Sequence, residues 1–177
     1  MSGAPEFSRP VAIDTLGEGP RAIAIEANAA ERAALADRFG LIAIDALQAE
    51  ARIRREGAIL YAEGRLRARA TQSCVATGEP VPARIDEAFA LRFEPEGEPG
   101  EEEFELDEGD LDVVSYAGGA IDLGEVVAQG FALALDPFPR IADADTALRA
   151  AGILSEEEAE AARQAASPFA ALKGLKE

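Results

Sequence analysis

Apolar and polar residues alternate with a period of two along the stretch from Ala46 to Ala70. Such alternation is typical of paired strands with one face against the core and the other in solvent. The Glu56-Gly57 dipeptide interrupts the pattern and predicts a two-residue hairpin turn. The pairs that follow from this turn are Arg54 with Ile59, Arg52 with Tyr61 and Glu50 with Glu63. A slip by one residue would bury arginines, so the two faces are well specified.

The two predicted faces of this hairpin differ in character. The face predicted to be buried carries small and aliphatic residues: Leu47, Ala49, Ala51, Ile53, Leu60, Ala62, Leu66, Ala68 and Ala70. The face predicted to be exposed carries charged and polar residues: Gln48, Glu50, Arg52, Arg54, Glu63, Arg65, Arg67 and Arg69. The hairpin should therefore place its alanine-rich side on the core and its arginine-rich side in solvent.

Shorter elements are predicted on both sides of the hairpin. Two strands, Phe7 to Ile13 and Arg21 to Glu26, are joined by a Gly/Pro turn. A helix from Ala29 to Phe39 opens with a capping box and ends at a glycine. After the hairpin, alternation from Ala83 to Phe93 predicts a third strand that returns beside its neighbour as an antiparallel meander.

The second half of the chain predicts helices. A short strand from Leu111 to Tyr116 precedes a helix that opens at Asp122 and carries an apolar stripe at helical spacing. Ser155 with Glu158 resembles another capping box, which predicts a helix of roughly ten residues. The fold class expected from this order is α+β, with an antiparallel, strongly curved meander sheet packed against two or three helices.

Three stretches of the second half carry a family resemblance. They are Thr71 to Pro82 (TQSCVATGEPVP), Ile121 to Arg140 (IDLGEVV running on to LALDPFPR) and Ser167 to Lys176 (SPFAALKGLK). In this order and at these distances they resemble the bacterial YceD family, also called large ribosomal RNA subunit accumulation proteins. The resemblance extends from about Gly64 to the end and touches the first half only loosely. It implies a role in making or maintaining large-subunit rRNA, and no known reaction.

The residue types present restrict the chemistry that the chain can perform. The chain has no histidine and one cysteine, so neither a Ser-His-Asp nor a Cys-His arrangement can form. Many YceD-like proteins carry a second cysteine close to the first, as if for a metal, but Val75-Ala76-Thr77 stand there in this chain. Cys74 is interpreted as a small apolar residue at a strand end. We therefore expect no enzyme activity, no catalytic residues, no metal, no cofactor and no small-molecule substrate.

Acidic residues are abundant, and their positions suggest structural roles. Asp122 and Glu125 are three residues apart at a helix start, where an N-cap residue and its N3 partner are expected, and this favours capping over acid–base chemistry. The net charge is −17, and the segment from Glu94 to Asp112 holds eleven acids and no base. With its Pro and Gly content, this segment predicts a flexible acidic loop at about residues 94–110. Alternatively, it docks on a basic partner.

The 177 residues are expected to form a single YceD-like domain. No apolar run reaches the length of a membrane helix, and no secretory signal is recognisable at the N-terminus, so a cytoplasmic location without membrane contact is expected. The arginine-rich face of the hairpin is the candidate binding surface for RNA or a partner. The candidate residues are Arg52, Arg54, Arg65, Arg67 and Arg69.

Arg65, Arg67 and Arg69 should project at about 7 Å intervals, close to the distance between successive phosphates of a nucleic-acid strand. Tyr61 is the one aromatic residue on this face, so contact with RNA would be directed at the backbone rather than at the bases. The other reading of the face is a merely solvated surface, or one that the acidic loop neutralises.

Two functions follow as hypotheses. The first is a non-enzymatic accessory factor in the accumulation or assembly of large-subunit rRNA, with that rRNA or a ribosomal protein as partner. The alternative is an acidic protein-interaction module that binds a basic, for example ribosomal, protein. A salt-dependent interaction with an rRNA fragment supports the first, and binding only to basic ribosomal proteins supports the second.

Overall fold

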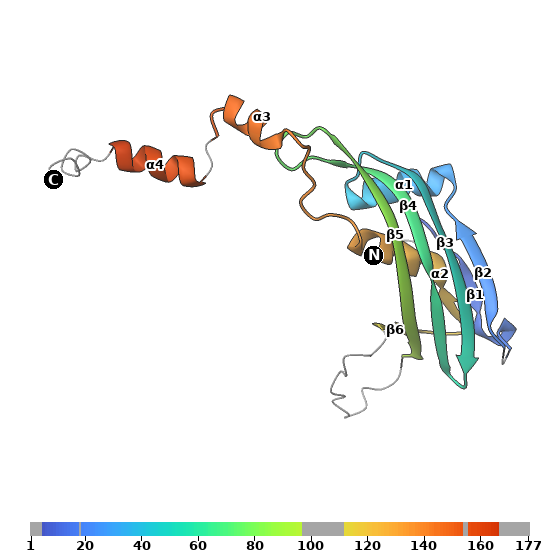
Figure 1. Ribbon diagram of the computed structural model, residues 1–177. Coiled ribbons are helices and arrows are strands. Elements are labelled where there is room, and N and C mark those ends of the chain that lie inside the picture. The colour runs from blue at the N-terminus through green and yellow to red at the C-terminus, as the bar shows by residue number, and fades with distance from the viewer. Residues whose placement is uncertain (1–4, 18, 97–111, 154–155, 167–177) are drawn as a thin grey trace.

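A computed structural model of the chain describes residues 5–17, 19–96, 112–153 and 156–166. Within these residues, five strands form an open sheet in the order β2-β3-β4-β5-β6 (Figure 1). Its strands are β2 (Arg21–Glu26), β3 (Ala43–Glu56), β4 (Ile59–Ser73), β5 (Pro80–Pro95) and β6 (Asp112–Tyr116). The first four strands form an antiparallel meander, and β6 adds parallel to β5. The expected α+β class with a mostly antiparallel sheet is confirmed.

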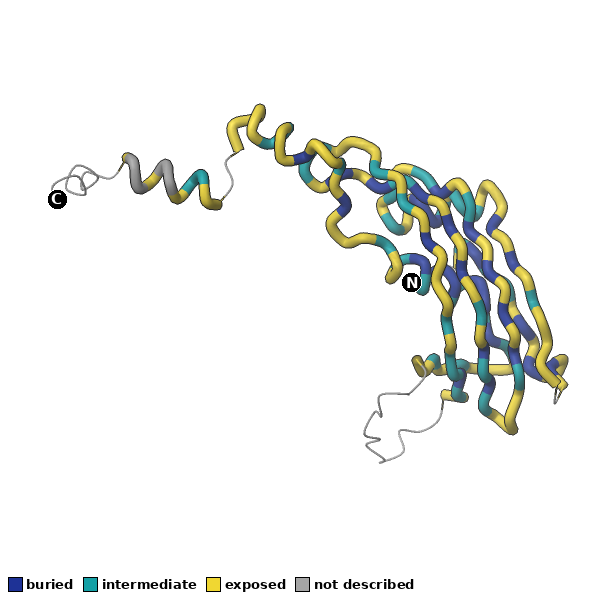
Figure 2. Tube along the Cα trace, viewed as in Figure 1, coloured by how far each residue is buried: buried dark blue, intermediate teal, exposed yellow. Residues whose placement is uncertain are grey.

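The long hairpin of β3 and β4 has the faces that its alternation predicts. Each of the nine residues expected on the inner face is buried, with Leu47, Ile53 and Leu60 completely so. Figure 2 shows the resulting alternation of buried and exposed positions along the strands. Burying an aliphatic side chain of this size contributes about 1.5–3 kcal/mol, so this face is the main source of stability for the sheet.

The turn of the hairpin lies one residue later than predicted. Gly57 and Ala58 occupy it, and Glu56 pairs with Ile59. The predicted partners therefore change: Arg54 pairs with Tyr61, Arg52 with Glu63 and Glu50 with Arg65. The φ of Gly57 is +63°, a value that a glycine at the first turn position accepts without strain. Both turns keep every side chain on the same face, which is why the alternation alone did not distinguish them.

A β-bulge near the start of β3 adjusts the inner face. The pairing register with β4 shifts between Ile44 and Ala46, so that Asp45 is an extra residue. Because of this insertion, Ile44 and Leu47 are both buried although they are three positions apart in a strand. The bulge also leaves the small side chain of Ala46 opposite Arg69.

The N-terminal segment differs from the predicted strand Phe7 to Ile13. Only β1 (Pro10–Ala12) is extended, and a 3-10 turn, η1 (Ile13–Thr15), follows it. β1 pairs antiparallel with β7 (Ala120–Asp122) in a separate two-stranded sheet. Val11 lies opposite Ile121 in this pair and both are buried. The pairing of β1 therefore depends on a segment about 110 residues later in the chain, which a local pattern does not reveal.

Two helices pack on the inner face of the large sheet. They are α1 (Ala29–Phe39), which lies on β3, and α2 (Leu123–Leu133), which lies on β4. Asn28 caps α1 in the predicted capping box with Glu31, and Gly40 ends the helix with a φ of +65°. The rings of Phe39 and Phe131 meet with centroids 6.0 Å apart, which joins α1 to α2.

The chain after α2 returns along the turn that follows β4. The amide of Val75 donates to the carbonyl of Pro139 at 2.9 Å, and the Gln72 side chain donates to the carbonyl of Asp136 at 2.8 Å. The helices α3 (Ala144–Ala150) and α4 (Glu156–Ala166) come next and extend away from the sheet in Figure 1. α4 confirms the predicted last helix, whereas its expected cap Ser155 and residues 97–110 of the expected acidic loop lie outside the described residues. The first two residues of that expected loop, Glu94 and Pro95, belong instead to the end of β5.

Candidate functional site

The outer face of the β3–β4 hairpin carries the five arginines that the sequence singles out. Arg52 and Arg54 project from β3, and Arg65, Arg67 and Arg69 project from β4. Arg54 is half-buried and the other four are exposed. Since positions two residues apart in a strand share a face, the three arginines of β4 form a row with a spacing of about 7 Å, as predicted.

The neighbouring strand β5 adds residues that were not among the predicted site residues. Arg84 lies directly opposite Arg69, and Asp86 lies directly opposite Arg67. The two residues are two positions apart in β5 and therefore share one face of the strand. What the sequence did not reveal was the pairing register between β4 and β5, which brings this face next to the arginines of β4.

The arginines line a continuous series of hollows along the outer face. Four adjoining hollows among the described residues have volumes of about 210, 570, 230 and 260 Å³, and each shares two or more lining residues with the next. The series runs from Pro20 and Tyr61 at one end to Arg84 at the other. We call it the arginine groove. Its charged lining residues are Glu26, Glu50, Arg52, Arg54, Glu63, Arg65, Arg67, Arg69, Arg84 and Asp86.

The groove is long and shallow because of the side chains on its borders. Ala22 and Ala24 of β2 and Ala46 of β3 leave room beside the long side chains of the two central strands. From Tyr61 to Arg69 the groove follows eight residue steps of β4, about 27 Å. This length matches an extended strand of several nucleotides better than it matches a compact small molecule.

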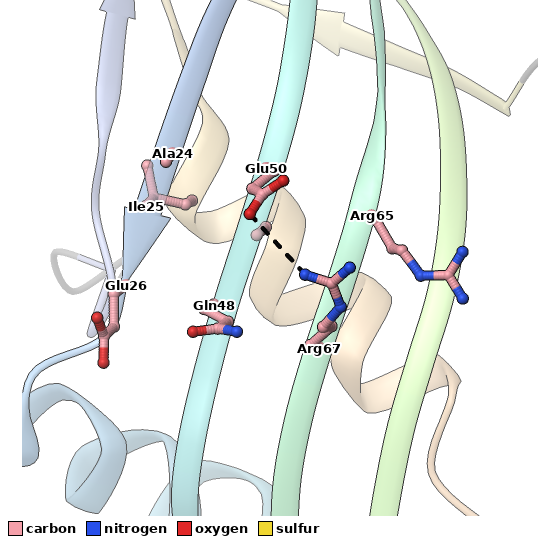
Figure 3. Close-up of a pocket in the computed structure, with 8 residues that line it drawn as sticks. Ala24, Ile25, Glu26, Gln48, Glu50, Arg65 and Arg67 are labelled. Carbon is pink, nitrogen blue, oxygen red and sulfur yellow. Dashed lines mark ion pairs between the residues drawn. The ribbon is translucent and has the colours of Figure 1, made fainter.

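Acidic side chains neutralise the arginines in the middle of the groove. Asp86 forms an ion pair with Arg65 and a longer one, 3.5 Å, with Arg67 Nε. Arg67 also lies 3.8 Å from Glu50, the contact drawn in Figure 3. The hydrogen bond from Arg65 holds the pKa of Asp86 below its usual value. All these side chains are at least 46% exposed, so the pairs contribute little to stability and can exchange partners.

The end of the groove at Arg69 and Arg84 is less neutralised than the middle. Among the described residues, no acidic side chain forms an ion pair with Arg52, Arg69 or Arg84. At the Pro20 end, the Arg54 guanidinium stacks over the ring of Tyr61, 4.1 Å from its centroid, and pairs with Glu56. The one aromatic face expected for base stacking is thus already covered by an arginine. The face fits contact with phosphates better than reading of bases.

Cys74 lies outside the groove, directly after β4, and is buried as expected for a small apolar residue. A hydrogen bond with the Thr77 side chain lowers the pKa of its thiol to about 7. With no histidine in the chain, this thiol has no imidazole base beside it. Within the described part of the chain, no group of three or more Cys, Asp or Glu side chains is arranged to hold a metal ion.

Asp122 has the structural role expected from the sequence. Its carboxylate accepts hydrogen bonds from the amides of Gly124 and Glu125 at the start of α2, at 3.0 and 3.2 Å. It also accepts from the Ser8 hydroxyl at 2.6 Å and the Arg9 amide at 2.7 Å. Glu125 does not complete a capping box, because its carboxylate binds Arg38 of α1 instead.

Comparison with known proteins identifies the family. Residues 62–176 match the family described as large ribosomal RNA subunit accumulation protein YceD. The chain belongs to the YceD family. This confirms the resemblance found in the sequence, which began at nearly the same residue. A search of curated proteins and a search of solved structures found no match.

The YceD match covers part of the arginine groove. It begins in β4 and therefore includes Arg65, Arg67, Arg69 and the β5 residues Arg84 and Asp86, whereas Arg52 and Arg54 precede it. The family description connects the chain with the accumulation of large-subunit rRNA and names no reaction. Among the described residues, no helix has both the length and the apolar character needed to span a membrane.

Proposed function

We propose that this YceD protein is a non-enzymatic accessory factor in the accumulation or assembly of large-subunit rRNA, and that it contacts RNA phosphates through the arginine groove. The observation that carries the proposal is the groove itself: six of the described arginines line about 27 Å of one exposed sheet face in a member of a family described by its effect on rRNA. A cytoplasmic location, where rRNA is assembled, is part of the proposal.

Arginine suits this task because its guanidinium donates two parallel hydrogen bonds to a phosphate and stays charged at any physiological pH. The row on β4 repeats at about the phosphate spacing of an extended strand. Asp86 and Glu50 lie beside this row and already occupy the donors of Arg65 and Arg67. An RNA strand has to displace these carboxylates, so binding should be weak and readily reversible.

The overall charge supports the same conclusion. At −17 the protein repels polyanions at long range, and the groove acts only within about a Debye length, 8 Å at physiological salt. The affinity for RNA should therefore depend steeply on the salt concentration. The RNA segment that binds should be single-stranded and accessible. The same negative charge favours a basic ribosomal protein as an alternative partner. The test must therefore distinguish binding to RNA from binding to a ribosomal protein.

The test measures binding of the full chain to a large-subunit rRNA fragment and, separately, to basic ribosomal proteins, over a range of salt concentrations. We expect the rRNA fragment to bind, and the logarithm of its binding constant to fall linearly with the logarithm of the salt concentration. Binding to ribosomal proteins alone, with no RNA binding even at low salt, would contradict RNA contact and support the acidic protein-interaction module instead.

A further inference from the structure

Arg69 of β4 and Arg84 of β5 face each other directly across the outer face of the sheet. Directly opposed residues on antiparallel strands have Cβ atoms about 4.5–5.5 Å apart, and like charges in such positions destabilise the sheet. Both side chains are exposed, and within the described residues neither forms an ion pair. This chain has twice as many acids as bases, yet it leaves two cations side by side.

Most other arginines of this face form ion pairs. Arg65 and Arg67 share Asp86, Arg54 has Glu56 and Tyr61, and Arg92 of β5 lies 2.5 Å from Glu94. Arg52 lacks an ion pair but lies opposite the acidic Glu63. The pair of Arg69 and Arg84 is different, because its two members oppose each other.

The space beside this pair can hold a ligand. A hollow of about 260 Å³ is lined by Arg69 and Arg84, with the small side chain of Ala46 beside them. Ala68 and Ile85 also border it, although both are buried on the inner face. Arg67 borders the hollow as a third cation. Asp86 borders it too, but its carboxylate is engaged by Arg65 and Arg67. The hollow is large enough for a phosphate group and its solvent.

We propose that Arg69 and Arg84 form a clamp that binds one phosphate of an RNA strand lying in the arginine groove. The proposal rests on the proposed function and adds a residue, Arg84, and a defined position for one phosphate. A phosphate between two guanidinium groups accepts charge-assisted hydrogen bonds from both and removes their mutual repulsion. Binding at this position therefore relieves a repulsion that the arginines paired with acids do not have.

The clamp is tested with a short single-stranded oligouridylate as the probe and the full chain as the protein. The test variant replaces both residues, Arg69→Gln and Arg84→Gln. The matched control replaces two arginines outside the groove, Arg21→Gln and Arg149→Gln, and so removes the same net charge. Affinity is measured as a function of salt, and thermal unfolding is measured at low salt for every variant.

We expect the test variant to bind about tenfold more weakly at fixed salt, whereas the control changes little. Because both arginines hold one phosphate, the salt slope should fall by about 0.7, half of the roughly 1.4 expected if each neutralised its own phosphate. Arg84→Gln alone should unfold no earlier than the wild type at low salt, since it removes a repulsion.

Three outcomes would overturn the clamp. Equal weakening in the test and control variants would mean that only net charge matters. A slope loss of about 1.4 would mean two separate phosphate contacts. Earlier unfolding of Arg84→Gln would mean that the opposed pair is not a repulsive one. If the wild type itself does not bind the probe at low salt, the proposed function fails together with the clamp, whereas the first three results leave RNA binding intact.

Discussion

Arg38 of α1 and Glu125 of α2 form a two-pronged ion pair, with Nη1–Oε2 and Nη2–Oε1 distances of 2.9 and 2.8 Å. Arg38 also reaches Glu6 of the N-terminal segment at 2.9 Å. One guanidinium thus joins three segments that are distant in sequence. Both helices pack on the inner face of the sheet, so this ion pair stabilises the sheet that carries the arginine groove. The ion pair itself lies outside the groove.

The pair predicts a pH-dependent loss of stability. The hydrogen bond from Arg38 lowers the pKa of Glu125 from its ordinary 4.5, so Glu125 contributes stability above that value and loses it as the pH falls through its lower folded pKa. We expect Glu125→Gln to cost about 1 kcal/mol at pH 7, since the pair is partly exposed. The free-energy difference between variant and wild type should disappear in acid. A difference that stays the same as the pH falls far below 4.5 would contradict this.

Gly124 predicts a second, larger effect on stability. A Cβ placed on this residue would overlap the carbonyl oxygen of Phe7, a backbone atom that has no freedom to rotate away. We expect Gly124→Ala to destabilise by about 3 kcal/mol. The control is Gly130→Ala in the same helix, where the nearest atom lies 3.9 Å away, and this change should stabilise by up to about 1 kcal/mol. The free energies of unfolding are measured in denaturant. Similar changes for the two variants would contradict the close approach of Gly124 to the Phe7 carbonyl.

The cap of α2 predicts a larger loss than an ordinary helix cap. Asp122 accepts four hydrogen bonds, two of which fix the N-terminal segment, so Asp122→Ala should cost about 2–3 kcal/mol. Asn28→Ala removes a more exposed cap at α1 and should cost about 1 kcal/mol. Denaturant unfolding of the two variants compares them directly. Equal losses would mean that the bonds to Ser8 and Arg9 contribute nothing.

Asp86 predicts a gain of binding. Its carboxylate engages Arg65 and Arg67, so Asp86→Asn should free Arg65 and leave Arg67 only its longer contact with Glu50. The affinity for single-stranded RNA should then rise several-fold. Asp37→Asn on α1 removes the same charge from an exposed site on the other side of the sheet and serves as the control. A gain equal to that of the control would show that long-range charge, rather than release of the two arginines, governs affinity.

Much of the groove could be predicted from alternation, because the assignment of residues to faces needs only a period of two. The row of Arg65, Arg67 and Arg69 was found in this way. The pairing register was not found, since turns at Glu56-Gly57 and at Gly57-Ala58 give the same faces. The register determines which charged residues lie opposite each other. It therefore determines which arginines have an acidic neighbour and which do not.

Other features depend on contacts between distant parts of the chain. The opposition of Arg69 and Arg84 follows from how the turn after β4 sets the register of β5. The pairing of β1 with β7 and the parallel addition of β6 to β5 join segments that no local pattern connects. The bond between Arg38 and Glu125 likewise replaced the capping role that local spacing suggested for Glu125.

The most direct test of the account is the salt dependence of rRNA-fragment binding for the wild type and for the combined variant Arg65→Gln, Arg67→Gln and Arg69→Gln. These surface changes should alter stability by no more than about 0.5 kcal/mol. If the groove contacts the phosphates of single-stranded RNA, each lost contact lowers the salt slope by about 0.7. The variant should therefore lose about 1.4 from its slope if Arg84 keeps the phosphate that it shares with Arg69, and about 2 if Arg69 holds a phosphate of its own. A folded variant with the wild-type slope and affinity would contradict the account and remove the arginine groove from the function of this protein.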